Sequence, residues 1–341
     1  MSFLNRGYRE GGESDEVMLA ATMDVSQGPV AEALERFGGR RVFFEKLQGN
    51  NGDRLIELGS VRALEQSGAQ IVDSPHQADA IIMNGGAGLT DIWKHGFETL
   101  RRYNTRHADT PLIVLPSSVL FEKSDFASLF VGRRAPAVLY ARERVSHDML
   151  SGLRYPSEVS IGIDHDMAFH LADSELVNRL RVRVSQKHIL VVERRDSESV
   201  SGPYRIDQPR GIKRLLPRTL KRAVRKHLIN PMFARRHAGE RLKSNQATAF
   251  ATESLGIVRR DYSHFSDHPV YADDISVPHR HTFEQFLELI ACSSVVFTTR
   301  LHVAILAAML DKPTYLKPGT FHKIRGIYEY SLCDRPNVKL M

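Results

Sequence analysis

The chain has 341 residues, of which 42% are hydrophobic and 26% charged, so it can bury a sizeable core, and its length favours two domains over one. Its two cysteines, Cys292 and Cys333, lie far apart without the spacing of a metal site, as is typical of a reducing compartment. No apolar run approaches the roughly 20 residues of a membrane helix, and the first residues lack the apolar core of a secretory signal. These features predict a cytoplasmic globular protein whose contact with a membrane is at most peripheral.

Short β-branched or apolar runs alternate with helical patterns through the first half of the chain. The runs have the composition of strands, and the segments between them, such as 54 to 68 and 91 to 107, have helical periodicity. A further helical pattern, PVAEALERF, precedes the first run. This alternation predicts a parallel sheet covered by helices. The expected strands are 41 to 47, 69 to 73, 79 to 84, 111 to 116 and 136 to 141.

A second series of the same kind begins at residues 188 to 196 and resumes beyond residue 243 with segments such as SVVFTT, RLHVAILAAML and PTYLK. The chain is therefore predicted to form two α/β halves, joined near residues 172 to 187. The expected organisation is an N-terminal extension with one helix (1–40), an N-terminal domain (41–180), and a C-terminal domain (181–341) that carries a basic insertion (205–243).

The net charge of +7 is concentrated in the basic insertion, which has 13 lysines and arginines against two acidic residues. Apolar residues recur at about one helical turn within PRTLKRAVRKHLI, so residues 217 to 229 are predicted to form a basic amphipathic helix. Such a helix either contacts an anionic membrane surface or packs its apolar stripe on the domain. Binding to nucleic acid is not expected, because Phe233 is the one aromatic residue in the segment and no known binding motif is present.

Ligands of open α/β sheets bind beyond the carboxyl ends of the strands, so the loops that follow the strands are the expected place for a site. The loop QGNNGDR contains Asn51 and Asp53. Asp53 either caps the helix that begins near Arg54 or binds a sugar and takes a proton from it. The loop NGGAG contains Gly85 and Gly86, which allow the backbone to approach a ligand closely or to turn with positive φ.

The segment TTRLHVAILAAMLDKP places Arg300 and His302 in the first turn of a predicted helix that Thr298 or Thr299 caps and Pro313 ends. Cations in that turn are unfavourable by about 0.3 to 1 kcal/mol each, and a bound anion reverses the balance. The functional interpretation is a phosphate or carboxylate site in which Arg300 donates hydrogen bonds and His302 donates or transfers a proton. The alternative is a solvated surface arginine and a capping histidine.

A second basic cluster follows the expected strand PTYLK, in the loop PGTFHKIRG. Adjacent parallel strands end at the same edge of a sheet, so His322 and Lys323 are expected near Arg300, with Lys323 as a further charge on the same anion. For Arg325 a solvated loop position is expected.

Several other site types are rejected or disfavoured. The glycines of NGGAG do not have the spacing of a dinucleotide fingerprint, and QGNNGDR lacks the Lys and Ser or Thr of a P-loop. LPSSVLF is not a nucleophile elbow. The cluster GIDHDMAFHL is interpreted as a turn between the domains, so no metal site is expected.

The ordered set GNNGD, NGGAG, LPSS, ARERVS, HDMAF, TTRLH with DKP, and FHKIRG resembles the polysaccharide pyruvyl transferase family over residues 48 to 332. The resemblance implies two Rossmann-like domains with parallel sheets, similar to a B-type glycosyltransferase. It also implies transfer of the enolpyruvyl group of phosphoenolpyruvate to a sugar, which forms a pyruvate ketal and releases phosphate without a further cofactor.

The resemblance also assigns residues. Arg300 and Lys323 match the family's arginine and lysine, and His302 and Asp53 match its histidine and loop aspartate, with His302 and Asp53 as the expected catalytic pair. The expected substrate-binding residues are Arg300, Lys323, His322, Asn51, Gly85 and Gly86. Family members often have glycine where this chain has Val303 and Asp311. Val303 is expected to narrow the space above the first turn, and Asp311 to adopt the left-handed conformation after the helix.

The resemblance implies a lipid-linked oligosaccharide or polysaccharide acceptor at the inner face of the plasma membrane, whose anionic surface would attract residues 213 to 228. Two alternatives stay open. A sugar-nucleotide glycosyltransferase of the same fold would use the cations for a diphosphate, and a non-catalytic anionic-glycan binding protein would bind without releasing phosphate.

Overall fold

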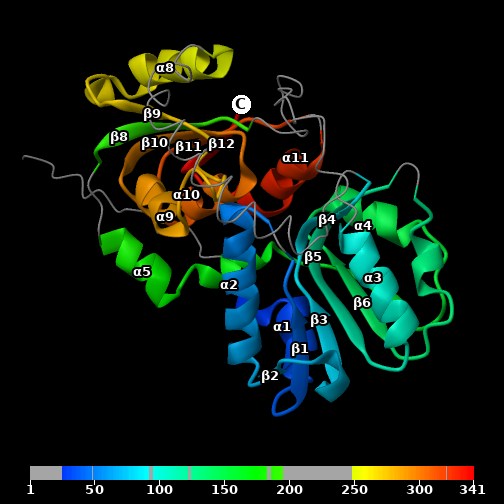
Figure 1. The fold of residues 1–341 in the computed structure, drawn as a ribbon. Coiled ribbons are helices and arrows are strands. Elements are labelled where there is room, and N and C mark those ends of the chain that lie inside the picture. The colour runs from blue at the N-terminus through cyan, green and yellow to red at the C-terminus, as the bar shows by residue number, and fades with distance from the viewer. Residues whose placement is uncertain are drawn as a thin grey trace, which may run out of the picture.

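A computed structural model describes residues 25–47, 49–91, 95–121, 124–182, 186–194, 248–319 and 321–341. In these ranges the chain forms two parallel β-sheets with helices around them, which confirms the predicted α/β class with two Rossmann-like units (Figure 1). The first sheet has the strand order β2-β1-β3-β5-β6-β7, and β4 pairs with the second part of β5. Its strands are β1 (Arg41–Glu45), β2 (Gln70–Val72), β3 (Ala80–Met83), β4 (Gly86–Thr90), β5 (Leu112–Leu120), β6 (Ala137–Ala141) and β7 (Val159–Ile163).

The second sheet has the order β12-β11-β10-β8-β9, and each of its strand pairings is also parallel. Its central strands are continuous apolar runs because helices cover both faces. All six residues of β10 are buried, for example. The strands are β8 (His188–Val192), β9 (Val270–Ala272), β10 (Ser293–Thr298), β11 (Thr314–Leu316) and β12 (Val338–Leu340).

The helices agree with the predicted pattern to within a few residues. The expected helix at 54 to 68 begins three residues earlier, because Asn50 and Asp53 form a capping box at its start. The expected helix before the first strand is α1. The helices of the first half are α1 (Pro29–Glu35), α2 (Asn51–Gln66), α3 (His95–Arg106), α4 (Arg144–Ser151) and α5 (Glu175–Val182); those of the second are α8 (Ala249–Asp261), α9 (Phe283–Ala291), α10 (Leu301–Met309) and α11 (Lys323–Ile327).

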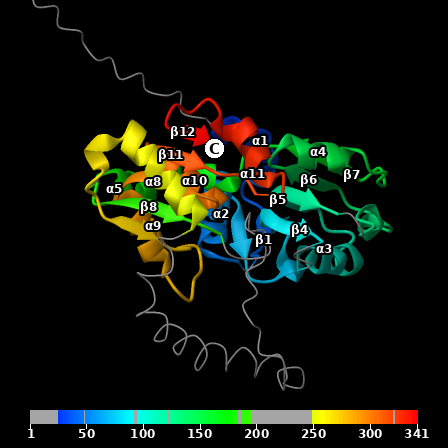
Figure 2. The same ribbon diagram turned by 90° about the horizontal axis from the view of Figure 1, so that it is seen from above.

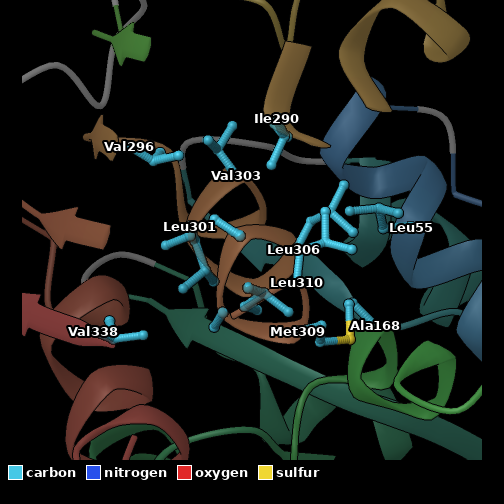
Figure 3. Close-up of a cluster of buried hydrophobic side chains, with 14 of the residues drawn as sticks. Leu55, Ala168, Ile290, Val296, Leu301, Val303, Leu306, Met309, Leu310 and Val338 are labelled. Carbon is cyan, nitrogen blue, oxygen red and sulfur yellow. The ribbon is translucent and has the colours of Figure 1, made fainter. Parts of the chain in front are cut away.

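Helix α10 joins the packing of the two halves. Its side chains are buried except for the partly exposed His302, as expected of a helix that is apolar on all sides. Leu55 of α2 and Ala168, in the 3₁₀ helix Met167–Leu171, belong to the same core cluster as Leu306 and Met309 of α10 (Figure 3). Figure 2 shows α2 and α11 between the strands of the first sheet and those of the second. The two halves thus share a core beneath the loops at their strand ends.

A glycine allows α2 to pack closely against the 3₁₀ helix Met167–Leu171. A Cβ atom at Gly59 of α2 would lie 1.8 Å from the carbonyl oxygen of Met167. We therefore expect Gly59→Ala to lower the free energy of unfolding by about 1 to 3 kcal/mol, because backbone would have to move. Gly256→Ala is the matched control, since that exposed glycine of α8 has nothing within 4 Å of the new methyl group and helix propensity favours alanine by up to about 1 kcal/mol. Thermal unfolding of both variants tests the prediction, and equal effects would contradict it.

Two predictions concern residues outside the described ranges. The basic insertion at 205–243, with its amphipathic helix, lies there, as do residues 1–24 of the N-terminal extension. Among the helices of the described ranges, we find none with the length and apolar character to cross a bilayer.

Candidate functional site

Two threonines at the turn between β10 and α10 bind backbone N–H groups. Thr298 Oγ1 accepts the N–H of Arg300 at 2.8 Å, and Thr299 Oγ1 accepts the N–H of Arg194, after β8, at 2.6 Å. The predicted cap by Thr298 or Thr299 is wrong, because Arg300 is itself the N-cap residue, one position before the predicted first turn, and no side chain caps the helix. His302 lies in the first turn as predicted. Val303, expected above this turn, is instead fully buried in the core, and Asp311 has the expected positive φ of 55°.

Arg300 forms a buried ion pair with Asp274, in the loop that follows β9. Its Nε and Nη2 donate to the two carboxylate oxygens of Asp274 at 3.0 and 2.5 Å, and both side chains are less than 10% exposed. A bidentate pair of this kind is geometrically specific. The sequence pattern predicted that Arg300 binds a substrate anion. In the structure the charge of Arg300 is also compensated by the carboxylate of Asp274.

His302 lies against a carboxylate of the first half. Its Nε2 is 3.3 Å from Oδ2 of Asp166, which also accepts a hydrogen bond from Nη1 of Arg142 at 2.7 Å. Asp166 and Arg142 are almost wholly buried, whereas the His302 side chain is 12% exposed. Burial alone would raise the pKa of Asp166, but the charges of His302 and Arg142 and the hydrogen bond from Ala168 outweigh it and hold the pKa well below its usual range. Asp166 is therefore an ionised orienting partner for the imidazole.

The start of α2 touches the same histidine. A Cβ atom at Gly52 would lie 2.8 Å from both Cβ and Nδ1 of His302, so glycine is needed for this approach. Asp53 is partly buried, and its Oδ2 accepts the N–H of Asn50 at 2.7 Å in the capping box. Its carboxylate thus holds the loop that borders His302. Asp53 takes part in capping as one alternative expected, but as the third residue of α2 and not as the predicted N-cap, which is Asn50.

Asn51 connects the start of α2 to the second half. Its buried Nδ2 donates to the carbonyl oxygens of Ile275 and His281 at 3.1 Å each, and its N–H donates to Ser276 at 2.9 Å. The structure therefore places Asn51 in a contact with the loop that carries Asp274.

Gly85 lies between β3 and β4, and Gly86 is the first residue of β4. A Cβ atom at Gly85 would be 2.4 Å from the carbonyl oxygen of Pro116, and Gly86 has a φ of 123°. The N–H of Gly85 donates to Asn84. Close packing on β5 and a left-handed backbone account for both glycines, as the positive-φ interpretation expected for Gly86.

His322 and Lys323 lie at the start of α11. Nε2 of His322 is 3.4 Å from Oε1 of Glu143 and 3.3 Å from Oγ of Ser146, both of which are buried in the first half. Burial alone would raise the pKa of Glu143, but hydrogen bonds from His322 and Ser146 outweigh it and lower the pKa. Lys323 is buried, with its ammonium 5.4 Å from the ring centroid of Phe321.

Four of these partners were not among the predicted site residues: Arg142, Glu143, Asp166 and Asp274. Arg142 and Glu143 lie in the quoted ARERVS motif and Asp166 in HDMAF. These motifs follow β6 and β7, so their place after a strand was the sequence signal that could have identified these three residues. Asp274 also follows a strand but belongs to none of those motifs. In the described residues, no three His, Cys, Asp or Glu side chains form a group that could hold a metal ion.

The buried His170, in the 3₁₀ helix that follows Asp166, predicts a pH dependence of stability. It is 5% exposed, and burial, helped by the charge of Arg62, lowers its pKa to about 4. The unfolded chain binds the proton near pH 6.5 and the folded chain only near pH 4. Stability contributed by the neutral imidazole is therefore complete above pH 6.5 and falls on acidification to pH 4, by about 3 kcal/mol in total.

We expect His170→Gln to flatten this loss. The measurement is the melting temperature between pH 7 and pH 4.5 in wild type and variant. His264→Gln replaces an exposed histidine of the 3₁₀ helix Ser263–Phe265 and serves as the control. A His170→Gln protein with the wild-type slope would refute the assignment.

These features define a two-domain α/β protein whose polar site lies where the carboxyl ends of two parallel sheets meet. The family model described as polysaccharide pyruvyl transferase matches residues 40–316. The chain belongs to the polysaccharide pyruvyl transferase family. A search of curated proteins found no match.

A solved structure supports the same architecture. The chain is similar to the crystal structure of a functionally uncharacterised protein from Klebsiella pneumoniae, with a TM-score of 0.56 and 18% sequence identity. The match covers 92% of this chain and 95% of the other. At this identity the likeness concerns the fold alone.

Proposed function

We propose that the protein transfers the enolpyruvyl group of phosphoenolpyruvate to a sugar of an exopolysaccharide precursor, forming a pyruvate ketal and releasing phosphate. Family membership supports pyruvyl transfer to a polysaccharide. The observation that carries the proposal is the pairing of His302 with the buried Asp166 at the start of α10, beside Arg300. A partly exposed imidazole on an ionised carboxylate is suited to proton transfer, and no cofactor beyond the donor substrate is required.

In the proposed reaction His302 delivers the proton to the methylene carbon of phosphoenolpyruvate, and a sugar hydroxyl attacks the neighbouring carbon. Arg300, Lys323 and the N–H groups at the start of α10 supply positive charge for the phosphate and carboxylate. Asp166 orients the imidazole. Asp53 fixes the loop next to His302 through its hydrogen bond from Asn50, and in this proposal it also orients the sugar hydroxyl or takes its proton.

The experiment that tests this function measures phosphate release from phosphoenolpyruvate, with and without a lipid extract that contains exopolysaccharide precursors. We expect release only with the extract, together with a product sugar heavier by one pyruvyl group. Release of a nucleoside diphosphate from a nucleotide sugar, with transfer of the sugar to the acceptor, would favour the glycosyltransferase alternative. Binding of the anionic glycan without any phosphate release would favour a non-catalytic glycan-binding protein.

We further propose that the acceptor is lipid-linked and that residues 213 to 228 hold the protein at the anionic inner face of the plasma membrane. Each lysine or arginine near such a surface contributes about 1 kcal/mol. We expect binding to vesicles that contain anionic phosphatidylserine to weaken with added salt and to vanish when the basic residues of 213 to 228 are replaced by glutamine. Equal binding of that variant would refute this role.

A further inference from the structure

A second histidine of the second half also lies on a buried carboxylate of the first half. His322 contacts Glu143 as His302 contacts Asp166, at 3.4 and 3.3 Å. Both carboxylates have no exposed surface, and both histidines are partly exposed, at 21% and 12%. Glu143 and Asp166 follow the neighbouring strands β6 and β7. The two pairs therefore stand side by side at one edge of the first sheet.

The two pairs are also linked through Arg142. Arg142 precedes Glu143 in the chain and donates a hydrogen bond to Asp166. The Arg142–Glu143 dipeptide therefore supplies one carboxylate and binds the other. Helix α11 is seated directly on Glu143, because a Cβ atom at Gly326 would lie 3.1 Å from that side chain. This packing places His322, at the start of α11, against the carboxylate.

A third histidine–carboxylate pair differs from these two in the solvent exposure of its histidine. His281 and Asp273 are 3.0 Å apart, but both belong to the second half and are less than 5% exposed. That imidazole is therefore almost inaccessible to a substrate. The hydroxyl of Ser146, next to His322, already makes two hydrogen bonds within the protein: it donates to Glu143 and accepts the N–H of Val119. His322 is the group in this cluster that can exchange a proton with a ligand.

We infer that His322, positioned by Glu143, is a second proton-transfer residue and acts in the step that releases phosphate, whereas His302 acts in the addition step. The inference rests on the proposed function. Lys323 follows His322 in the chain, and a lysine ammonium is a suitable point charge for a departing phosphate.

Ketal formation has two proton transfers to assign. In the addition, a sugar oxygen bonds to C2 of phosphoenolpyruvate, C3 takes a proton through His302, and the hydroxyl loses one. In the second step, the bond between C2 and the phosphate oxygen breaks, and the phosphate leaves with the electron pair and a proton from His322. The second hydroxyl bonds to C2 and returns its proton to that histidine. The two hydroxyl protons thus end on C3 and on phosphate.

The test uses the full chain in D₂O with phosphoenolpyruvate and the lipid extract. Released phosphate and deuterium at C3 of the recovered phosphoenolpyruvate are measured together. We expect His322→Gln to release phosphate about 100-fold more slowly, while deuterium still enters C3 through reversible addition at His302. His302→Gln is expected to lose both signals. Glu143→Gln keeps an oxygen that can accept the α4 cap from Ser146 and should resemble His322→Gln with a smaller loss.

His268→Gln is the control and should behave as wild type. His268 lies just before β9 and contacts Ser294 at the start of β10, at the end of the second sheet opposite to the site. Wild-type phosphate release by His322→Gln, or equal loss of release and deuterium exchange, would overturn this inference alone. If the wild-type protein releases no phosphate, the proposed function fails and this inference fails with it.

Discussion

Replacing Arg300 with alanine is expected to abolish phosphate release and also to lower the free energy of unfolding by about 3 to 5 kcal/mol. The second effect arises because Asp274 would remain as a buried carboxylate without its bidentate partner. Loss of activity in this single variant is therefore ambiguous, since it has both a chemical and a structural cause.

The double variant Arg300→Ala with Asp274→Ala separates these causes. Removing both charges avoids the uncompensated carboxylate, so we expect its melting temperature to recover most of the loss, with a favourable coupling energy in the double-mutant cycle. Phosphate release should stay absent, because the cation for the substrate anion is still missing. Recovery of release in the double variant would show that Arg300 has a structural role only.

Hydrophobic periodicity and the residues that follow each strand predicted most of the strands and helices and identified His302 and His322 as site residues. The apolar run at 79 to 84 is β3, and the carboxyl ends of parallel strands hold the polar residues, as the alternating pattern indicated. The start of α2 was predicted less well, because Asp53 was the expected cap before Arg54, whereas Asn50 is the N-cap and forms a capping box with Asp53. Short-range patterns of this kind depend on neighbours in the chain.

The partners of the histidines could not be predicted in that way. Asp166 is 136 residues from His302, and Glu143 is 179 positions before His322, so only the packing of the two halves brings them together. Asp274 likewise belongs to a loop whose approach to Arg300 depends on β8, β9 and β10 being adjacent. Pattern and spacing identified the cations, whereas the fold supplied the carboxylates that set their chemistry.

His302 is expected to separate activity from stability, unlike Arg300. In His302→Gln the carboxylate of Asp166 keeps the hydrogen bonds from Arg142 and from the N–H of Ala168, so it stays compensated. We therefore expect a melting temperature close to that of wild type, together with a 10²- to 10⁴-fold loss in the rate of phosphate release, the range typical of a lost general acid or base. Asp166→Asn should lower both the melting temperature and the rate of phosphate release, because the buried Arg142 would then have no anionic partner. Phosphate release and thermal unfolding of the two variants are the measurements. A stable His302→Gln protein with near wild-type turnover would exclude His302 as the proton donor and leave the Asp166 pair as a structural contact between the two halves.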